Sequence, residues 1–104
     1  MKTIIDKSYQ QKIRDLIVAL HPHVKIYLFG SQATGSQATG AQVHGSDIDI
    51  ALDAGKPMNR AEVGEVREVL NATDIPYKID VVDFHSVPEA MQKMILKEGI
   101  VWKS

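Results

Sequence analysis

Cysteine is absent from the 104-residue sequence, which excludes disulfide bonds and thiolate chemistry. Any metal site must therefore use carboxylates, carbonyl oxygens, water or histidine, and this set favours hard cations such as Mg²⁺ or Mn²⁺. Neither sign of charge is in excess, because 12 Lys and Arg stand against 13 Asp and Glu for a net charge of −1. The balance provides no electrostatic footprint for direct binding of DNA or RNA.

Long apolar stretches are also lacking. No apolar run approaches the roughly 20 residues that a membrane-spanning helix needs, and residues 1–6 lack the apolar core of a signal peptide. From these absences we expect a cytoplasmic protein without a membrane segment. The length and the apolar share of 44% fit one compact domain, so we expect a single domain over residues 1–104.

The hydrophobic periodicity predicts helices alternating with short strands. Apolar residues at helical spacing predict a first helix over residues 9–20, which the His-Pro-His sequence at 21–23 should end. β-branched, aromatic or alternating segments predict strands over residues 24–29, 46–52, 77–84 and, briefly, 100–102. The order predicts an α/β (α+β) protein with a small mixed β-sheet flanked by helices.

Two further helices have recognisable N-terminal signals. Asn59 with Glu62 three residues later predicts a capped helix, whose apolar stripe is Val63, Val66 and Leu70. Ser86 with Glu89 predicts a second capping box, with Pro88 in the first turn. Met91, Met94 and Ile95 should line this last helix, which Gly99 should end.

Two acids in the second predicted strand suggest a metal site. Asp47 and Asp49 are two residues apart, so a strand points both to one face while Ile48 and Ile50 point to the other. Adjacent carboxylates repel one another unless a positive charge lies between them, and a divalent cation is a natural partner. The alternative is a pair of solvated acids on an exposed face of the sheet.

Asp80 strengthens the metal interpretation. It lies inside the third predicted strand, between Ile79 and Val81, where an acid is costly unless it is paired or bound to metal. Asp83 is a weaker candidate, because at the strand end beside Phe84 we expect it to be solvated. Three carboxylates on adjacent strands could hold two metal ions about 3.5–4 Å apart, the usual arrangement for attack at phosphorus.

Gly30 and Ser31 directly follow the first predicted strand and are expected to open a helix. A helix N-terminus presents free backbone N–H groups to an anion, and glycine lets the backbone approach a phosphate closely. Ser31 could add a hydroxyl donor. The alternative is an ordinary turn in which Ser31 is the N-cap.

Taken together, residues 28–31, 46–52 and 79–82 closely resemble the minimal nucleotidyltransferase (MNT) group of the DNA polymerase beta superfamily. The resemblance covers most of the chain and implies the nucleotidyltransferase fold. It implies nucleotide binding at Gly30, Ser31 and Ser46. It further implies that Asp47 and Asp49 bind both metal ions, and that Asp80 binds the catalytic metal and helps to deprotonate an incoming hydroxyl.

The same resemblance implies a reaction and a partner. MNT proteins typically accompany a helical HEPN protein, and in several pairs the MNT antitoxin transfers AMP from ATP to a tyrosine of the HEPN toxin. We therefore expect a Mg²⁺-dependent adenylyltransferase that acts as an antitoxin in a hetero-oligomer. The main alternative is a non-catalytic subunit that neutralises or complements a helical partner by binding. A transferase for small molecules is a third reading, although such relatives generally carry an added helical domain.

Two departures from the MNT pattern favour weakened activity. The family's first motif commonly has arginine where this chain has Gln32 and Thr34, and no Lys or Arg occurs from Ile26 to Gly55. The sequence Gly-Ser-Gln-Ala-Thr at 30–34 is also repeated at 35–39, which lengthens the loop. Either copy could supply the phosphate-binding Gly-Ser pair. We favour Gly30 and Ser31 over residues 35 and 36, because the first pair directly follows the strand.

Overall fold

The computed structural model describes residues 6–30 and 47–104, so most of the duplicated loop lies outside the described residues. The elements are α1 (Lys7–Leu20), β1 (Lys25–Phe29), β2 (Ile48–Asp53), α3 (Arg60–Asn71), β3 (Ile79–Asp83), α4 (Glu89–Glu98) and β4 (Ile100–Lys103). Their order confirms the predicted α+β chain, including the short final strand. The helix expected after Gly30 falls outside the described residues.

The four strands form one mixed sheet in the order β3-β2-β1-β4. Strand β1 runs antiparallel to both β2 and β4, whereas β2 and β3 are parallel. Phe29 is the register partner of Asp49, and Asp49 is in turn the partner of Asp80. The sheet therefore brings the ends of three separate segments together at one corner.

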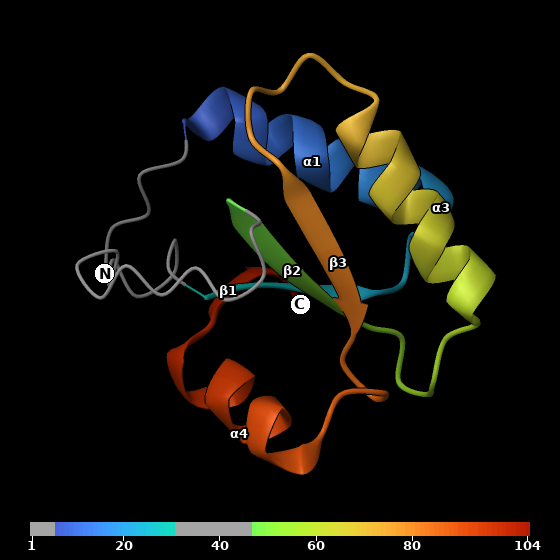
Figure 1. Ribbon diagram of the computed structural model, residues 1–104, viewed down its shortest axis with the longest axis vertical. Helices are drawn as coiled ribbons and strands as arrows, with labels where there is room; N and C mark the ends of the chain where they lie inside the picture. Colours follow the sequence, from blue (N-terminus) through green and yellow to red (C-terminus); the bar gives the residue numbers. More distant parts are fainter. Residues whose placement is uncertain (1–5, 31–46) are drawn as a thin grey trace.

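Helices cover both faces of the sheet (Figure 1). Helices α1 and α3 lie on one face, over a core that includes Ile26, Leu28, Ile48, Ile50, Ile79 and Val81. Helix α4 lies on the other face, over Tyr27, Phe29, Ala51 and Phe84. The predicted stripes are confirmed, since Val63, Val66 and Leu70 of α3 and Ile95 of α4 are buried. Strand alternation therefore assigns Asp49, which lies between Ile48 and Ile50, to the α4 face.

The two predicted capping boxes have different outcomes. At α3 the box is confirmed, because Ala61 N donates to Asn59 Oδ1 and Asn59 N donates to Glu62 Oε1. At α4 the prediction is wrong, because the N-cap is Pro88 and no side chain caps the helix. The Ser86 hydroxyl instead donates to Asp83 Oδ2 at 2.6 Å. An ionised carboxylate is a strong acceptor, so this bond holds the Ser86 side chain toward Asp83, in the turn before α4.

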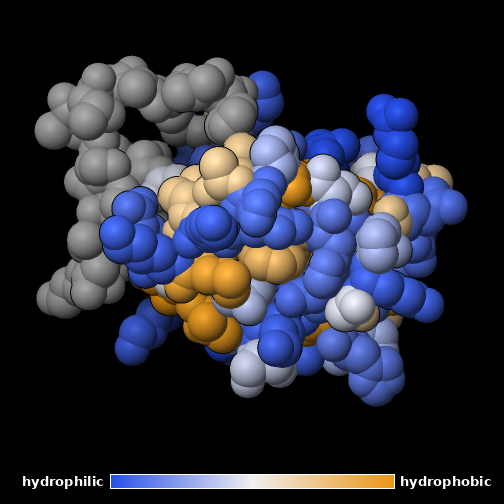
Figure 2. Space-filling view, turned by 90° about the horizontal axis from the view of Figure 1, so that it is seen from below, coloured by the Kyte–Doolittle hydropathy of each residue, from blue (hydrophilic) through white to orange (hydrophobic). Residues whose placement is uncertain are grey.

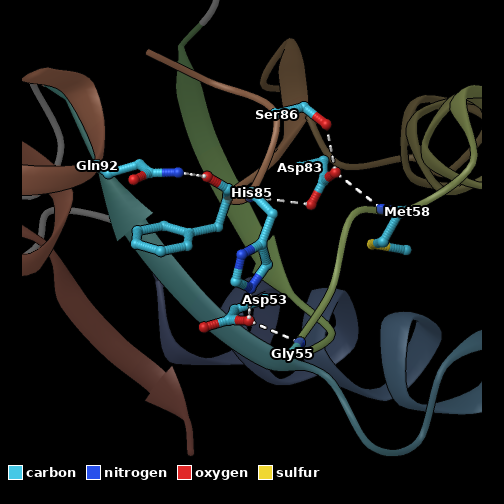
Figure 3. A network of polar contacts seen from close by, with 8 residues as sticks. Asp53, Gly55, Met58, Asp83, His85, Ser86 and Gln92 are labelled. Carbon is cyan, nitrogen blue, oxygen red and sulfur yellow. Dashed lines mark hydrogen bonds and ion pairs between the residues drawn. The ribbon is translucent and has the colours of Figure 1, made fainter. Parts of the chain in front are cut away.

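Asp83 is buried, with 6% of its surface exposed, so the expectation of a solvated acid is wrong. Its carboxylate accepts hydrogen bonds from Ser86 Oγ, Met58 N at 2.8 Å and His85 N at 3.1 Å (Figure 3). These donors satisfy the charge that burial would otherwise make costly. Asp83 thereby ties the segment before α3 to the turn after β3.

The outer edge of β3 is closed by side chains of α3. Asn71 donates to Ile79 O at 2.7 Å and accepts from Ile79 N at 3.0 Å. Arg67 donates to Val81 O at 2.7 Å. An uncovered edge strand presents unpaired backbone groups, and these side chains satisfy several of them. They also fix α3 to β3 in one register.

Asp53, at the other end of β2, forms an ion pair with His85 in the turn after β3 (Figure 3). The distance from His85 Nε2 to Asp53 Oδ1 is 2.6 Å, and Gly55 N donates to the same oxygen. Burial acts to raise the pKa of Asp53. The hydrogen bonds from Gly55 and His85 and the nearby His85 and Lys25 charges outweigh burial and lower this pKa below 3.8.

We expect Asp53→Asn to lower the free energy of unfolding by about 1 kcal/mol at pH 7. A lowered folded-state pKa stabilises the fold above the unfolded-state pKa, and this contribution disappears as pH falls through the folded-state pKa. The difference between wild type and variant should therefore shrink as pH falls below about 3.8, toward the lowered pKa of folded Asp53. Urea denaturation at pH 7 and at pH 3 measures it, and a difference that is equal at both pH values contradicts the assignment.

No helix in residues 6–30 or 47–104 is long and apolar enough to cross a membrane.

Candidate active site at the corner of strands β1, β2 and β3

Two carboxylates lie side by side on adjacent strands. Asp49 of β2 and Asp80 of β3 are direct register partners in a parallel pair. Partners in neighbouring strands share a face, and the strands are about 4.8 Å apart. Asp49 is buried, at 8% exposure, whereas the Asp80 side chain is 34% exposed. Two negative charges at this separation favour a cation between them, which agrees with the hard oxygen chemistry expected of Mg²⁺.

Asp47 lies immediately before β2, because the strand begins at Ile48 and not at residue 46 as predicted. Its position is fixed by Lys78, because Asp47 N donates to Lys78 O at 2.9 Å and Lys78 N donates to Asp47 Oδ2 at 3.0 Å. This double contact places Asp47 beside the start of β3, near the Asp49–Asp80 pair.

The described residues contain no preformed group of three or more His, Asp and Glu side chains placed to hold a metal ion. Asp47 Oδ2 and Asp80 Oδ1 are each bonded within the protein. A carboxylate accepts at both oxygens, so each of these acids has a second oxygen for a cation. The donor set fits Mg²⁺ or Mn²⁺, and coordination by all three acids stays a prediction.

Gly30 approaches the acids from the end of β1. Its φ of +79° is a left-handed conformation that favours glycine. A Cβ atom at this position would lie 2.5 Å from Asp49 Oδ2, closer than contacts allow. Gly30 therefore brings the backbone directly against the Asp49 carboxylate, and its contact with phosphate stays a prediction. Ser31, Ser46 and the second copy at residues 35 and 36 lie outside the described residues, so their nucleotide contacts stay predictions.

Arg67 is a site residue that the sequence analysis missed. Arg67 Nε donates to Asp80 Oδ1 at 3.1 Å, and the side chains are 45% and 34% exposed. The sequence held a partial signal, because Asp80 was expected to need a partner and Arg67 lies one helical turn after Val63 of the apolar stripe. The sequence does not indicate which acid Arg67 contacts, because this contact depends on the packing of α3 against β3.

A groove of about 320 Å³ lies beside Arg67, between α3 and β3. Arg60, Val63, Val82 and Val87 contribute to its walls. A second cavity of about 230 Å³, lined in part by His21 and Lys56, lies beyond the opposite ends of β1 and β2. The groove lies next to the acid pair through Arg67, which lines it and bonds to Asp80.

The fold and this corner define a nucleotidyltransferase domain. The family described as "Polymerase beta, Nucleotidyltransferase" matches residues 11–104, and the chain belongs to this family. The match confirms the resemblance drawn from Gly30, the acids of residues 46–52 and Asp80.

Individual proteins similar to this chain are also found within the nucleotidyltransferases. The chain is similar to the probable protein adenylyltransferase MntA of Haemophilus influenzae, with 24% identity over 89 residues, covering 86% of this chain and 74% of the relative. It resembles in fold a chain of the complex between tri-AMPylated Shewanella oneidensis HEPN toxin and MNT antitoxin, with a TM-score of 0.72 and 23% identity over 94% of this chain and 71% of that chain. A toxin–antitoxin structure with AMP-PNP matches at a TM-score of 0.68 and 28% identity, over 89% of this chain and 71% of that chain.

Proposed function

We propose that this protein is a Mg²⁺- or Mn²⁺-dependent adenylyltransferase that moves AMP from ATP to a tyrosine hydroxyl of a helical HEPN toxin, and so acts as the antitoxin. The observation that carries the proposal is the Asp49–Asp80 pair with the Gly30 backbone against it. Membership of the nucleotidyltransferase family supports the reaction class. The similarity to a probable protein adenylyltransferase and to an MNT antitoxin complex supports the acceptor and the partner.

The reaction joins the tyrosine oxygen to the α-phosphorus of ATP. The bond from this phosphorus to the bridging oxygen breaks, and pyrophosphate leaves. Asp80 accepts the proton of the attacking hydroxyl, while Asp47, Asp49 and Asp80 would hold the metal. When bound, Mg²⁺ neutralises phosphate charge and so stabilises the charge that develops during transfer.

The corner separates the two substrates. Gly30 lies at the β1 side of Asp49, so the triphosphate belongs there, where Ser31 and Ser46 would add donors. Asp80 lies on the outer strand beside the groove lined by Arg67 and Val82, so the acceptor hydroxyl belongs on that side. This division aligns the acceptor, the α-phosphorus and the leaving group across the acid pair.

The surface supports a protein partner. Leu96 of α4 and Val101 of β4 are large apolar residues that are 60% and 55% exposed. Figure 2, which views the molecule from the α4 side, shows apolar residues gathered among hydrophilic ones. Exposed apolar surface rimmed by polar residues is typical of an interaction site. It agrees with a hetero-oligomer in which the HEPN protein supplies the acceptor.

Transfer of label from α-³²P-ATP to the purified HEPN partner tests the function. We expect labelling that requires Mg²⁺ and release of pyrophosphate, whereas γ-³²P-ATP should leave the partner unlabelled. ATP with Mg²⁺ at 100 times its dissociation constant should also stabilise the protein by about 2.7 kcal/mol, a shift of several degrees in melting temperature. Partner binding without any labelling contradicts the enzyme assignment.

The non-catalytic binding subunit is the second candidate, and one observation favours it. No Lys or Arg occurs from Ile26 to Gly55, so charge on the triphosphate would fall to metal ions, backbone amides and a distant or partner residue. A binding subunit should form the complex and neutralise the toxin equally well after all three acids are replaced by asparagine. An adenylyltransferase should lose neutralisation in that variant.

A further inference from the structure

The guanidinium of Arg67 forms hydrogen bonds to two consecutive residues of β3. Its Nε donates to the Asp80 side chain at 3.1 Å, and its Nη2 donates to the carbonyl of Val81 at 2.7 Å. The guanidinium is planar and rigid, so the two bonds are not independent. They fix the Asp80 carboxylate relative to the backbone of its own strand.

The stem of Arg67 is itself held in place. Val63 and Asn71 lie one turn before and one turn after it on α3. Val63 is 8% exposed and packs in the core, while Asn71 bonds both backbone groups of Ile79. Arg67 thus projects from an anchored helix across the outer edge of the sheet to a carboxylate that lies on the opposite face.

Asp80 needs such support more than Asp49 does. Asp49 is buried at 8% exposure beside Gly30, whereas the Asp80 side chain is 34% exposed on the edge strand. A half-exposed aspartate samples several rotamers unless a partner selects one. Proton transfer, by contrast, requires the base within hydrogen-bond reach of the acceptor hydroxyl.

We propose that Arg67 is a positioning residue that holds Asp80 in its catalytic orientation. The inference rests on the proposed function, in which Asp80 receives the acceptor proton. In this arrangement Arg67 acts on the reaction through Asp80. It also offsets the repulsion between Asp49 and Asp80 when no metal is bound.

Arg67→Met keeps most of the apolar stem and removes the guanidinium that forms the two hydrogen bonds. We expect kcat for AMP transfer to fall about tenfold, the range typical of residues that orient a metal ligand. The KM for ATP should be unchanged, because the triphosphate lies on the Gly30 side. Mn²⁺ binding, measured by electron paramagnetic resonance, should be retained, because Asp47 and Asp49 also belong to the proposed metal site. Arg67→Lys keeps the positive charge but lacks the planar guanidinium, so its kcat should lie between those of Arg67→Met and wild type.

Lys12→Met is the matched control. It makes the same kind of change, the loss of a cation paired with an aspartate, at the exposed Lys12–Asp74 pair between α1 and the loop after α3. It should leave kcat within about twofold of wild type. Loss of a surface cation and its ion pair alone therefore does not imitate the Arg67 effect.

The outcomes separate the two proposals. If wild type transfers AMP and Arg67→Met does so within twofold of the same kcat, the role of Arg67 is refuted and the function stands. Complete loss of Mn²⁺ binding in Arg67→Met also refutes it, because Asp47 and Asp49 remain to hold the ion. If wild type neither binds Mn²⁺ nor transfers AMP, the proposed function fails, and the inference fails with it.

Discussion

Asp49→Asn should reduce AMP transfer by about a thousandfold while leaving the fold intact, because metal ligation stabilises the transition state by several kcal/mol. Asp49 is the most buried of the three acids and faces Asp80 directly across the β2–β3 pair. Asparagine keeps the shape of the side chain but removes the charge that a divalent cation needs. Labelled AMP transfer under single-turnover conditions measures the loss at the chemical step.

Asp49→Asn should also change the melting temperature differently in the absence and in the presence of ATP and Mg²⁺. Without metal, the Asp49→Asn variant should melt at the same temperature as wild type or higher, because the repulsion with Asp80 is gone. With ATP and Mg²⁺, the stabilisation seen in wild type should be absent. Asp15→Asn is the control, since it makes the same chemical change at an exposed position of α1. AMP transfer at the wild-type rate in Asp49→Asn would refute the assignment of Asp49 as a metal ligand.

Gly30→Ala should reduce AMP transfer by about a hundredfold, because the added methyl group must displace Asp49. The new Cβ would lie 2.5 Å from Asp49 Oδ2, and displacements near 1 Å can cost about a hundredfold in rate. The left-handed φ of +79° adds strain for any residue with a Cβ, about 1–2 kcal/mol of stability. Kinetics and urea denaturation measure the two effects separately.

Gly55→Ala is the control that separates the effect of backbone strain from the effect of displacing Asp49. Gly55 has nearly the same backbone angle, φ +82°, but a Cβ there would meet nothing within 4 Å. This variant should lose similar stability and keep its activity. Equal losses of activity in Gly30→Ala and Gly55→Ala would show that strain, and not the contact with Asp49, governs the site.

The elements could be predicted from the sequence because their signals are local. The alternation of Ile48, Asp49 and Ile50 determined that the acid lies on the face opposite the two isoleucines, and the structure confirms that both isoleucines are fully buried. The Asn59–Glu62 box was equally secure, since both partners lie within one helical turn. The Ser86–Glu89 box failed because the helix begins two residues later than the box requires, with Pro88 as its N-cap.

The burial of Asp83 shows why the end of a strand is hard to assess from sequence. Nothing in its neighbours indicates that Met58 N, from the segment before α3, will reach it across 25 residues. The carboxylate is buried because these donors converge on it, and their convergence depends on how β2, α3 and the turn after β3 pack. A pattern along the chain contains no such information.

By itself, the sequence determined which residues could do the chemistry: the acids Asp47, Asp49 and Asp80, and a glycine at position 30. Only the tertiary structure decided that β3 lies beside β2 in the register that pairs Asp49 with Asp80, and that Arg67 crosses the sheet edge to hold Asp80. Side-chain direction follows from the local two-residue period of a strand. Strand order and the reach of a helix side chain follow from burial of the whole core, which no single segment specifies.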